Sequence, residues 1–192
     1  MKRRPAGFSL VELMVAMVIA LIVVSAVVAL VLSVLRTNAA AATSVKLTQD
    51  GRAIGDIVGR ELRRARFAGN YLQFVGTSGA IANAFGVVDL TTAGCVKFSY
   101  DANANGVVNA NEPKSLFRSG NNIYLKQSAT IAASDCSVTN ALRLNSPDVQ
   151  VTGLVFTRTN NQVAVTLTLA LDSDTTITRS FNQSVQLRNP FL

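Results

Sequence analysis

The sequence contains no histidine and no tryptophan, and aromatic residues make up only 6% of it. The absence of histidine removes the most common general base and the most common zinc ligand of proteins. The sequence also has no G-x-S-x-G elbow, no G-x-x-x-x-G-K-[ST] phosphate loop and no C-x-x-C pair. With so few aromatic side chains, a platform for stacking nucleic-acid bases is not expected. We therefore expect a protein that is not an enzyme.

Acidic residues are also scarce. Lysine and arginine number 18 against 11 aspartate and glutamate residues, which gives a formal net charge of +7. Three of the 18 basic residues, Lys2, Arg3 and Arg4, lie at the N-terminal end, so the rest of the chain has 15 against 11. That remainder is only mildly basic, and the overall charge is weak evidence of nucleic-acid binding.

A long apolar stretch follows these basic residues. No charged residue occurs in the 23 residues from Leu13 to Leu35, which is long enough to cross a bilayer. The preceding basic residues predict an N-terminus in the cytoplasm and the bulk of the chain across the membrane. A cleaved secretory signal peptide ending near Ala39–Ala42 is one interpretation, although its apolar core should be about half as long. A plain membrane anchor is a second.

Glu12 fits neither interpretation. A lone carboxylate at the head of an apolar helix costs a few kcal/mol in a membrane, and Lys2 to Arg4 are at least two turns away. A buried charge normally has a partner. A cut between Gly7 and Phe8 would create a new α-amine. That amine could approach Glu12 of its own chain or, in a packed filament, Glu12 of the adjoining subunit.

The segment from Gly7 to Glu12, G-F-S-L-V-E, resembles the class III signal of type IV prepilins and pseudopilins. The shared pattern is a short basic leader, a Gly before the cut, a Phe after it, Glu as the fifth mature residue, and then the apolar helix. The resemblance implies cleavage after Gly7 and N-methylation of Phe8 by a prepilin peptidase. It also implies that the helix first lies in the inner membrane and later in the filament core. Methylation keeps the positive charge of the amine.

The helix is expected to continue beyond the membrane. Apolar residues recur at spacings of three, four and seven between Thr43 and Phe67, at Val45, Leu47, Ile54, Ile57, Val58, Leu62 and Ala65. This spacing predicts one helical face that rests on a sheet. Gly51, Gly55 and Gly59 recur every fourth residue, which indicates either close backbone approach, to the sheet or to a neighbouring subunit, or local looseness.

The same helix is rich in arginine, at positions 52, 60, 63, 64 and 66, with Asp50, Asp56 and Glu61 as partial partners. A solvated face with surface ion pairs is the simpler interpretation. Contact with lipid headgroups, a partner subunit or DNA is the alternative.

Beyond Gly69 the sequence changes to short alternating or β-branched runs separated by Gly, Asn, Ser and Thr. The runs predict strands at Leu72–Val75, Val87–Leu90, Val96–Tyr100, Ser115–Arg118, Ile123–Lys126, Ala141–Leu144, Val149–Thr157, Val163–Leu171 and Thr176–Leu187. Asn160 and Asn161 between two of them predict a hairpin. We expect an α+β, type IV pilin-like fold, with a long N-terminal helix packed on an antiparallel sheet. The expected segments are a leader (1–7), a transmembrane and filament-core helix (8–35), its amphipathic continuation (36–68) and a periplasmic β-rich head (69–192).

The helix segment from Gln49 to Gly69 and the closing Val185-Gln-Leu-Arg-Asn resemble the PilW-like minor pilins. That resemblance implies a low-abundance subunit that helps to prime or cap a type IV pilus. Its partners would be the prepilin peptidase, other major and minor pilins, the inner membrane and the assembly machinery. Minor pseudopilins of type II secretion share the leader and are the main alternative. A filament-borne subunit that binds DNA or a surface is a third hypothesis, supported only by the arginine-rich helix.

Two cysteines, Cys95 and Cys136, are present. An even number in an exported protein favours one disulfide, which would stabilise the fold by roughly 4 kcal/mol in the chain-entropy model. The alternative is two buried thiols that never meet.

The segment from Asp101 to Glu112, D-A-N-A-N-G-V-V-N-A-N-E, fits the EF-hand calcium loop at every defined position. The expected ligands are Asp101, Asn103, Asn105, the carbonyl of Val107, Asn109 and Glu112, with Gly106 at the sharp turn. With only two charged ligands, the affinity for Ca²⁺ should be weak, in the range of about 0.1–1 mM. The flanking segments read as strands instead of helices, so an Asn/Gly-rich hairpin loop without metal is the alternative.

Overall fold

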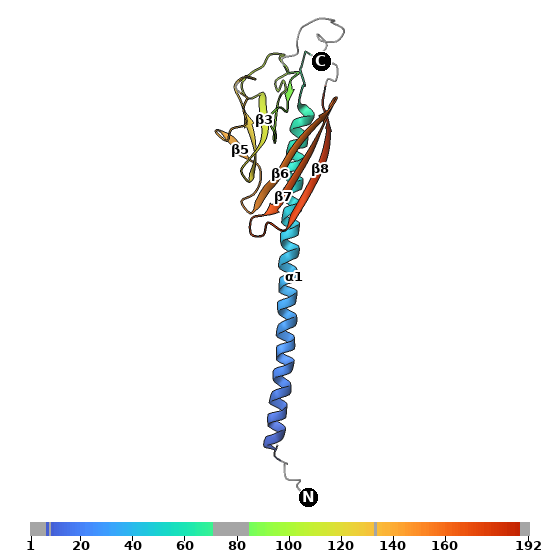
Figure 1. Cartoon of the computed structure of the whole chain (residues 1–192), viewed down its shortest axis with the longest axis vertical. Coiled ribbons are helices and arrows are strands. Elements are labelled where there is room, and N and C mark those ends of the chain that lie inside the picture. The colour runs from blue at the N-terminus through green and yellow to red at the C-terminus, as the bar shows by residue number, and fades with distance from the viewer. Residues whose placement is uncertain (1–6, 8, 71–84, 133, 189–192) are drawn as a thin grey trace. The chain divides into compact units, whose positions relative to one another are not determined.

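The computed structural model describes residues 7, 9–70, 85–132 and 134–188 (Figure 1). Phe8, most of the expected leader and the expected strand Leu72–Val75 lie outside these residues. The chain divides into two compact units, Met1–Ser44 and Val45–Leu192. Each unit is described separately below.

The first unit consists of the N-terminal part of α1, a helix that runs from Leu10 to Arg64. All residues from Leu10 to Ala42 are exposed. This part of α1 is long and apolar enough to cross a membrane. Its side chains are therefore not buried among the described residues.

In the second unit the remainder of α1 has a buried face. Leu47, Ile54, Val58 and Leu62 are almost completely buried and recur at helical spacing, as the sequence predicts. Val45 and Ile57 are exceptions, because Val45 remains half exposed and Ile57 is only partly buried. The expected helix extends to residue 68, whereas α1 ends at Arg64. The chain turns at Arg66, whose φ of 67° is left-handed and whose backbone N–H donates to the carbonyl of Ser99 at 2.9 Å.

Two antiparallel sheets follow the helix, where one was expected. The first is a five-stranded meander in sequence order: β1 (Val88–Asp89), β2 (Cys95–Ser99), β3 (Pro113–Ser119), β4 (Asn122–Gln127) and β5 (Ala141–Arg143). The second contains β6 (Val149–Thr159), β7 (Gln162–Leu171) and β8 (Thr178–Gln186), also in sequence order. Each of these eight strands coincides with a predicted one, and the α+β class is confirmed.

The β6–β7 hairpin turns at Asn160 and Asn161, as predicted, and Asn160 has a left-handed φ of 51°. Alternate residues of both strands point into the core, among them Val151, Val163 and Leu167. One hydrophobic cluster joins the inner face of α1 to residues of both sheets. The second unit, Val45–Leu192, is called the head from here on. It has a single core, although its strands form two sheets.

Direct hydrogen bonds hold the two sheets together at the β3–β4 turn. Val151 N–H donates to the carbonyl of Asn121 at 2.8 Å, and Arg118 Nε donates to the carbonyl of Val151, also at 2.8 Å. Cys95 and Cys136 form a disulfide across 41 residues of sequence. The predicted pairing is thus present, and it joins β2 to the segment before β5.

Candidate functional site

The candidate assembly site lies at the start of α1. Gly7 is exposed, the helix begins at Leu10, and the carbonyl of Ser9 accepts the first helical hydrogen bond from Leu13 N–H at 3.2 Å. Glu12 lies in the first turn, where the positive end of the helix dipole favours a carboxylate. Its side chain is exposed and makes no hydrogen bond or ion pair with any described residue.

Ser9 and Glu12 also have the spacing of an N-terminal capping box, in which the two side chains would bond reciprocally to backbone N–H groups. This was not recognised from the sequence. Neither side chain makes such a bond among the described residues. The carboxylate of Glu12 therefore remains available to a group from outside the helix.

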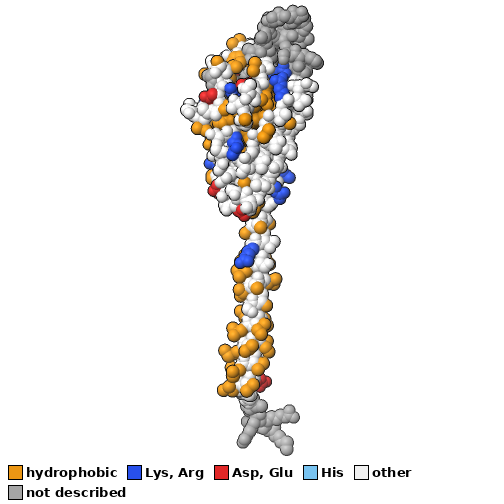
Figure 2. Space-filling view, viewed as in Figure 1, with side chains coloured by type: hydrophobic (Ala, Val, Ile, Leu, Met, Phe, Trp, Pro, Cys, Tyr) orange, Lys and Arg blue, Asp and Glu red, His pale blue; other side chains and the backbone are white. Residues whose placement is uncertain are grey.

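Hydrophobic side chains cover the apolar stretch of α1 that follows Glu12 (Figure 2). The large ones from Leu10 to Leu35 are all about half exposed or more. Exposed apolar surface of this extent marks a site for lipid or for other protein chains. The carboxylate and the apolar surface together form a site for insertion and packing.

A second carboxylate of α1, Glu61, is buried and fully paired. Its Oε2 forms an ion pair with Lys114 Nζ at 3.2 Å and accepts from the Tyr100 hydroxyl at 3.1 Å, and Arg64 Nη1 lies 4.0 Å from Oε1. Glu61 was expected to pair with arginines on a solvated face. Glu61 follows Ile54 by seven residues and Val58 by three, so it lies on the same face of α1 as these buried residues. This spacing could have predicted its burial. This cluster attaches α1 to the five-stranded sheet.

The arginines of α1 belong to different environments. Arg52, Arg60 and Arg63 are exposed and form no ion pair among the described residues, as on a solvated face. Arg66 contradicts that expectation, because it is only 1% exposed and its Nη1 donates to Asn161 Oδ1 at 2.9 Å. Burial, with a smaller effect of Arg158, lowers the pKa of Arg66. Arg66 ties the end of α1 to the β6–β7 hairpin.

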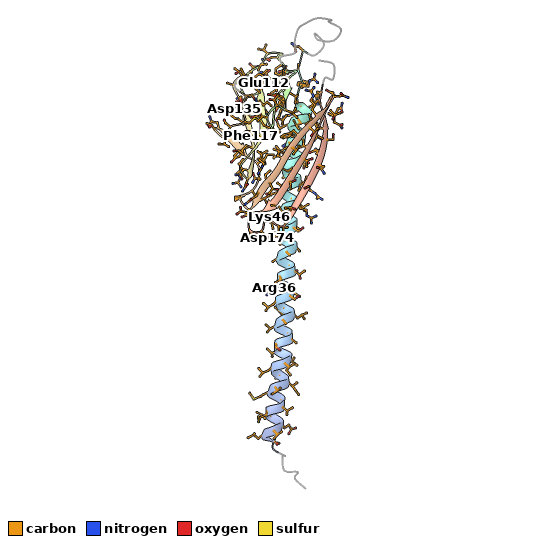
Figure 3. The ribbon with its side chains drawn as sticks, viewed as in Figure 1. Arg36, Lys46, Glu112, Phe117, Asp135 and Asp174 are labelled. Carbon is orange, nitrogen blue, oxygen red and sulfur yellow. A yellow bond between two sulfur atoms is a disulfide. The ribbon has the colours of Figure 1, made fainter. Side chains whose placement is uncertain are left out.

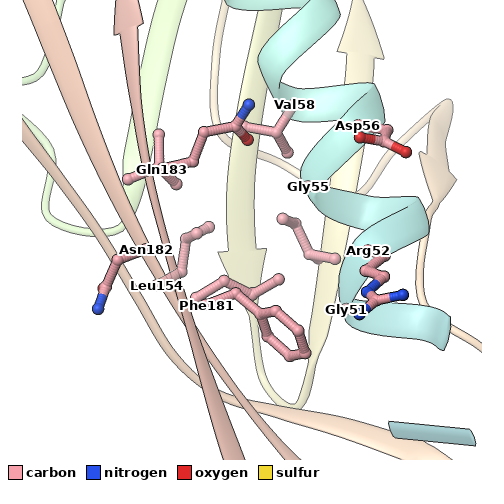
Figure 4. A pocket seen from close by; sticks show the side chains of 12 residues that line it. Gly51, Arg52, Gly55, Asp56, Val58, Leu154, Phe181, Asn182 and Gln183 are labelled. Carbon is pink, nitrogen blue, oxygen red and sulfur yellow. The ribbon is translucent and has the colours of Figure 1, made fainter. Parts of the chain in front are cut away.

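Two of the three regularly spaced glycines allow β8 to approach the helix closely (Figure 4). A Cβ on Gly51 would lie 2.1 Å from the ring of Phe181, and one on Gly59 would lie 2.3 Å from Nε2 of Gln183. A Cβ on Gly55 would have no neighbour nearer than 3.7 Å. Of the interpretations of this spacing, close approach to the chain's own sheet is therefore correct at Gly51 and Gly59. A cavity of about 200 Å³ lies beside Gly51 and Gly55, and residues of α1, β4, β6, β7 and β8 line it.

The expected calcium loop connects β2 to β3, and its first residue is held by backbone N–H groups. Asp101 is 1% exposed and accepts hydrogen bonds from the N–H groups of Gly69 at 2.8 Å, Asn105 at 3.1 Å and Gly106 at 2.7 Å. Gly106 has a φ of 75°, as its place in the sharp turn requires. The carboxylate thus organises the first half of the loop.

The last residue of the loop closes it. Glu112 is 2% exposed and accepts from the N–H groups of Ala102 at 2.9 Å and Asn109 at 2.6 Å. Because Glu112 accepts from the N–H of Ala102, this last expected calcium ligand lies close in space to the first, Asp101. Glu112 forms no ion pair with a described residue.

The asparagines between these ends also turn their side chains toward the backbone of the loop. Asn103 Oδ1 accepts from Asn105 N–H at 3.1 Å, and Asn105 Oδ1 accepts from Val107 N–H at 2.9 Å. Asn109 Nδ2 donates to the carbonyl of Val107 at 2.7 Å and to Asn105 Oδ1 at 3.2 Å. Two expected calcium ligands, Asn105 Oδ1 and the Val107 carbonyl oxygen, therefore lie around the same donor, Asn109 Nδ2. The described residues contain no group of three or more Cys, Asp or Glu side chains placed to hold a metal ion.

The comparison with protein families agrees with this site. Residues 2–28 match the prokaryotic N-terminal methylation motif, which together with the apolar helix and the β-rich head defines a type IV pilin-like protein. Residues 40–187 match the prepilin peptidase-dependent protein B family, and the chain belongs to that family. The comparisons with curated proteins and with solved structures found no match.

Proposed function

We propose that this protein is a PilW-like minor pilin, a structural subunit that primes or caps the assembly of a type IV pilus. The observation that carries the proposal is the exposed carboxylate of Glu12, which has no partner among the described residues and lies at the head of an exposed apolar stretch of α1. A head with its own disulfide and hydrophobic core supports it, because the core residues all lie from Leu47 onward, outside the apolar stretch. Membership of a prepilin peptidase-dependent family is consistent with it.

The proposed mechanism begins with hydrolysis of the peptide bond after Gly7. This step releases the α-amine of Phe8, which becomes N-methylated and keeps its positive charge. Within apolar surroundings that amine and Glu12 of an adjoining subunit would each provide the counter-charge that the other lacks. The pairing therefore sets the axial position of one subunit against the next. The protein's role is structural, and the chemistry on it is performed by the peptidase.

The proposed location follows from the same residues. Lys2, Arg3 and Arg4 would keep the N-terminus in the cytoplasm, and the head would lie in the periplasm before assembly. The apolar part of α1 would cross the inner membrane once and then move into the filament. Other pilins and the assembly machinery are the proposed partners.

The test is a set of three single variants expressed in the native host. Gly7→Ala should block processing, so that the chain still begins at Met1 by mass spectrometry. Glu12→Ala should be processed and methylated but should be lost from sheared filaments, because the new amine has no counter-charge. Asp56→Ala is the matched control, since Asp56 is an exposed carboxylate on the same helix without a partner among the described residues. Normal incorporation of the Glu12→Ala variant would refute the mechanism.

A minor pseudopilin of type II secretion would have the same leader and the same pairing of the new α-amine with Glu12. Deletion of the gene distinguishes the two systems, with piliation and protein secretion scored in the same strain. We expect loss of surface pili with normal secretion. Loss of secretion with normal pili would assign the protein to the secretion system.

We also propose that the loop from Asp101 to Glu112 binds Ca²⁺ weakly. Two buried carboxylates without an ion pair among the described residues support this, as does the convergence of the Asn105 and Val107 oxygens on one donor. A carboxylate oxygen that accepts one N–H still has a lone pair for a cation. Binding would require the Asn109 amide to turn its oxygen inward.

A calcium titration of the full chain in detergent, followed by the melting temperature of the head, tests this proposal. At tenfold excess over the Kd, stability should rise by about 1.4 kcal/mol. Magnesium should have less effect, because it prefers a tighter octahedral site. Asn103→Ala and Glu112→Gln should reduce the calcium-dependent shift. An unchanged melting temperature at several millimolar Ca²⁺ would contradict the proposal.

A further inference from the structure

A cavity of about 330 Å³ lies where the end of α1 meets the beginning of the 101–112 loop. The residues that line it come from three parts of the head: Arg64, Phe67, Tyr100, Asp101, Ala102 and Arg188. Its walls combine two arginines with two aromatic rings. Neither the insertion and packing site nor the proposed calcium ligation uses these arginines.

Each arginine rests on one of the rings. The Cζ atom of Arg64 lies 5.5 Å from the centroid of Tyr100, and that of Arg188 lies 5.4 Å from the centroid of Phe67. Contact with a ring restricts the guanidinium plane. Arg64 Nη1 donates to the Tyr100 hydroxyl at 3.5 Å, and its other guanidinium N–H groups make no hydrogen bond with a described residue. Ordered guanidinium groups lose less entropy when they bind an oxyanion.

The positive charge of these groups is poorly compensated. Glu61 Oε1 lies 4.0 Å from Arg64 Nη1, and Glu61 Oε2 is already in an ion pair with Lys114 Nζ at 3.2 Å. Arg188 is exposed and forms no ion pair with any described residue. Asp101 is the acidic group of the wall, and three backbone N–H groups already hold its oxygens. The lining therefore carries a net charge of one positive unit.

We propose that this cavity is an oxyanion site that receives a carboxylate from an acidic side chain of a neighbouring pilin subunit. The identity of the donor rests on the proposed function, whereas the binding itself does not. A carboxylate matches the flat fork of a guanidinium and carries a single charge. A phosphate dianion would be repelled more strongly by Asp101, and the small cavity suits a side chain better than a nucleic-acid backbone.

The binding test uses the full chain in detergent micelles with ¹⁵N-labelled arginine. Sodium acetate is titrated at constant ionic strength, with chloride as the balancing ion, and arginine Nε–Hε signals are followed by NMR. The signals of Arg64 and Arg188 should move together and saturate with one common Kd. Arg60, an exposed arginine of the same helix without a stacked ring, should not respond. Arg64→Gln or Arg188→Gln should weaken acetate binding about tenfold or more, whereas Arg60→Gln should not.

Equal, unsaturated shifts of all exposed arginines would overturn the site. Tighter binding of inorganic phosphate or of a single-stranded oligonucleotide than of acetate would overturn the assignment to a carboxylate. The donor is tested separately by incorporation of the Arg64→Gln/Arg188→Gln double variant into sheared filaments. We expect normal processing and at least severalfold lower incorporation. If the double variant enters filaments normally although the wild type binds acetate, a neighbouring subunit does not supply the carboxylate. That result would not contradict the proposed function.

Discussion

The two parts of α1 have one secondary structure and opposite surroundings. From Leu10 to Ala42 every residue is exposed, whereas from Leu47 onward one face of the helix is buried in a core. A helix in a globular domain is stabilised mainly by packing of its apolar face. The first part has no such packing among the described residues, and we propose that lipid or other subunits provide it.

The two glutamates of the helix repeat this contrast. Glu61 is buried, pairs with Lys114 and accepts a hydrogen bond from Tyr100, while Glu12 has no partner among the described residues (Figure 3 draws the side chains along α1). A buried carboxylate requires a donor both in a protein core and in the apolar surroundings proposed for the first part of α1. One part of the helix receives its donor by folding, and we propose that the other receives it by cleavage and assembly.

Removing the donor of Glu61 should produce the largest effect on stability. Lys114→Met leaves a buried carboxylate without its cation and should destabilise the head by about 3–5 kcal/mol, measured by urea unfolding. Lys97→Met is the control, since its partner Asp89 is partly exposed at 3.3 Å, and about 1 kcal/mol or less is expected. The double variant Glu61→Gln/Lys114→Met should recover part of the loss. If Lys114→Met lowered the free energy of unfolding by less than Lys97→Met does, Glu61 would not depend on its partner, and the contrast with Glu12 would be wrong.

A charge placed in the first part of α1 should act on insertion and leave the fold of the head unchanged. Val23→Asp should cost about 2.5–3.5 kcal/mol of apparent insertion free energy, since Val23 lies in the middle of the apolar stretch. The measurement is the fraction of chain that resists carbonate extraction from membranes, with Val23→Leu as the control. Unfolding of the soluble head by urea should be the same in both variants. A change in head stability would show that the two parts are not independent.

Two glycine substitutions on the second part should change stability in opposite directions. Gly55→Ala adds a methyl group where space is open and should stabilise the head by up to about 1 kcal/mol through helix propensity. Gly51→Ala forces the ring of Phe181 to move, and about 1–3 kcal/mol of overpacking should outweigh that gain. Melting temperatures of the two variants, compared with the wild type, test the close contact between α1 and β8. Equal stabilisation by both would contradict it.

The smallest expected effect is on the acid sensitivity of the head. The backbone N–H of Thr91, with smaller contributions from the Thr91 side chain and Lys97, lowers the pKa of Asp89. The unfolded state therefore binds a proton more readily, so the contribution of Asp89 is complete above its unfolded pKa of about 4 and is lost as the pH falls through the folded pKa. Asp89→Asn should reduce the stability difference between neutral and acidic pH. An unchanged difference would assign the acid sensitivity to other groups.

Much of the fold is readable in the sequence because it depends on local patterns. The apolar stretch, the face of Leu47, Ile54 and Leu62 and the Asn160–Asn161 turn follow from periodicity and turn chemistry, and the structure confirms them. The pairing of Cys95 with Cys136 follows from their number. The roles of Gly7, Phe8 and Glu12 remain predictions, which rest on the charge in an apolar segment and on the resemblance to prepilin signals.

The remaining features depend on contacts that are distant in sequence. The division into two sheets is set by the β3–β4 turn, which meets β6 at Val151. Glu61 and Arg66 read as surface charges because their partners, Lys114 and Asn161, are 53 and 95 residues away. The cavity of Arg64 and Arg188 joins residues from opposite ends of the head. No local pattern contains this information.

The disulfide between Cys95 and Cys136 encloses β3, β4 and the whole segment from Asp101 to Glu112. Closing a loop with a separation of 41 residues removes about 4 kcal/mol of unfolded-chain entropy in the simplest model. A head made in a reducing compartment lacks this contribution until its thiols are oxidised elsewhere. If the head is exported as we propose, the thiol state of this one pair would record whether a given copy has crossed the membrane, and a trapped reduced form would mark subunits still waiting for translocation.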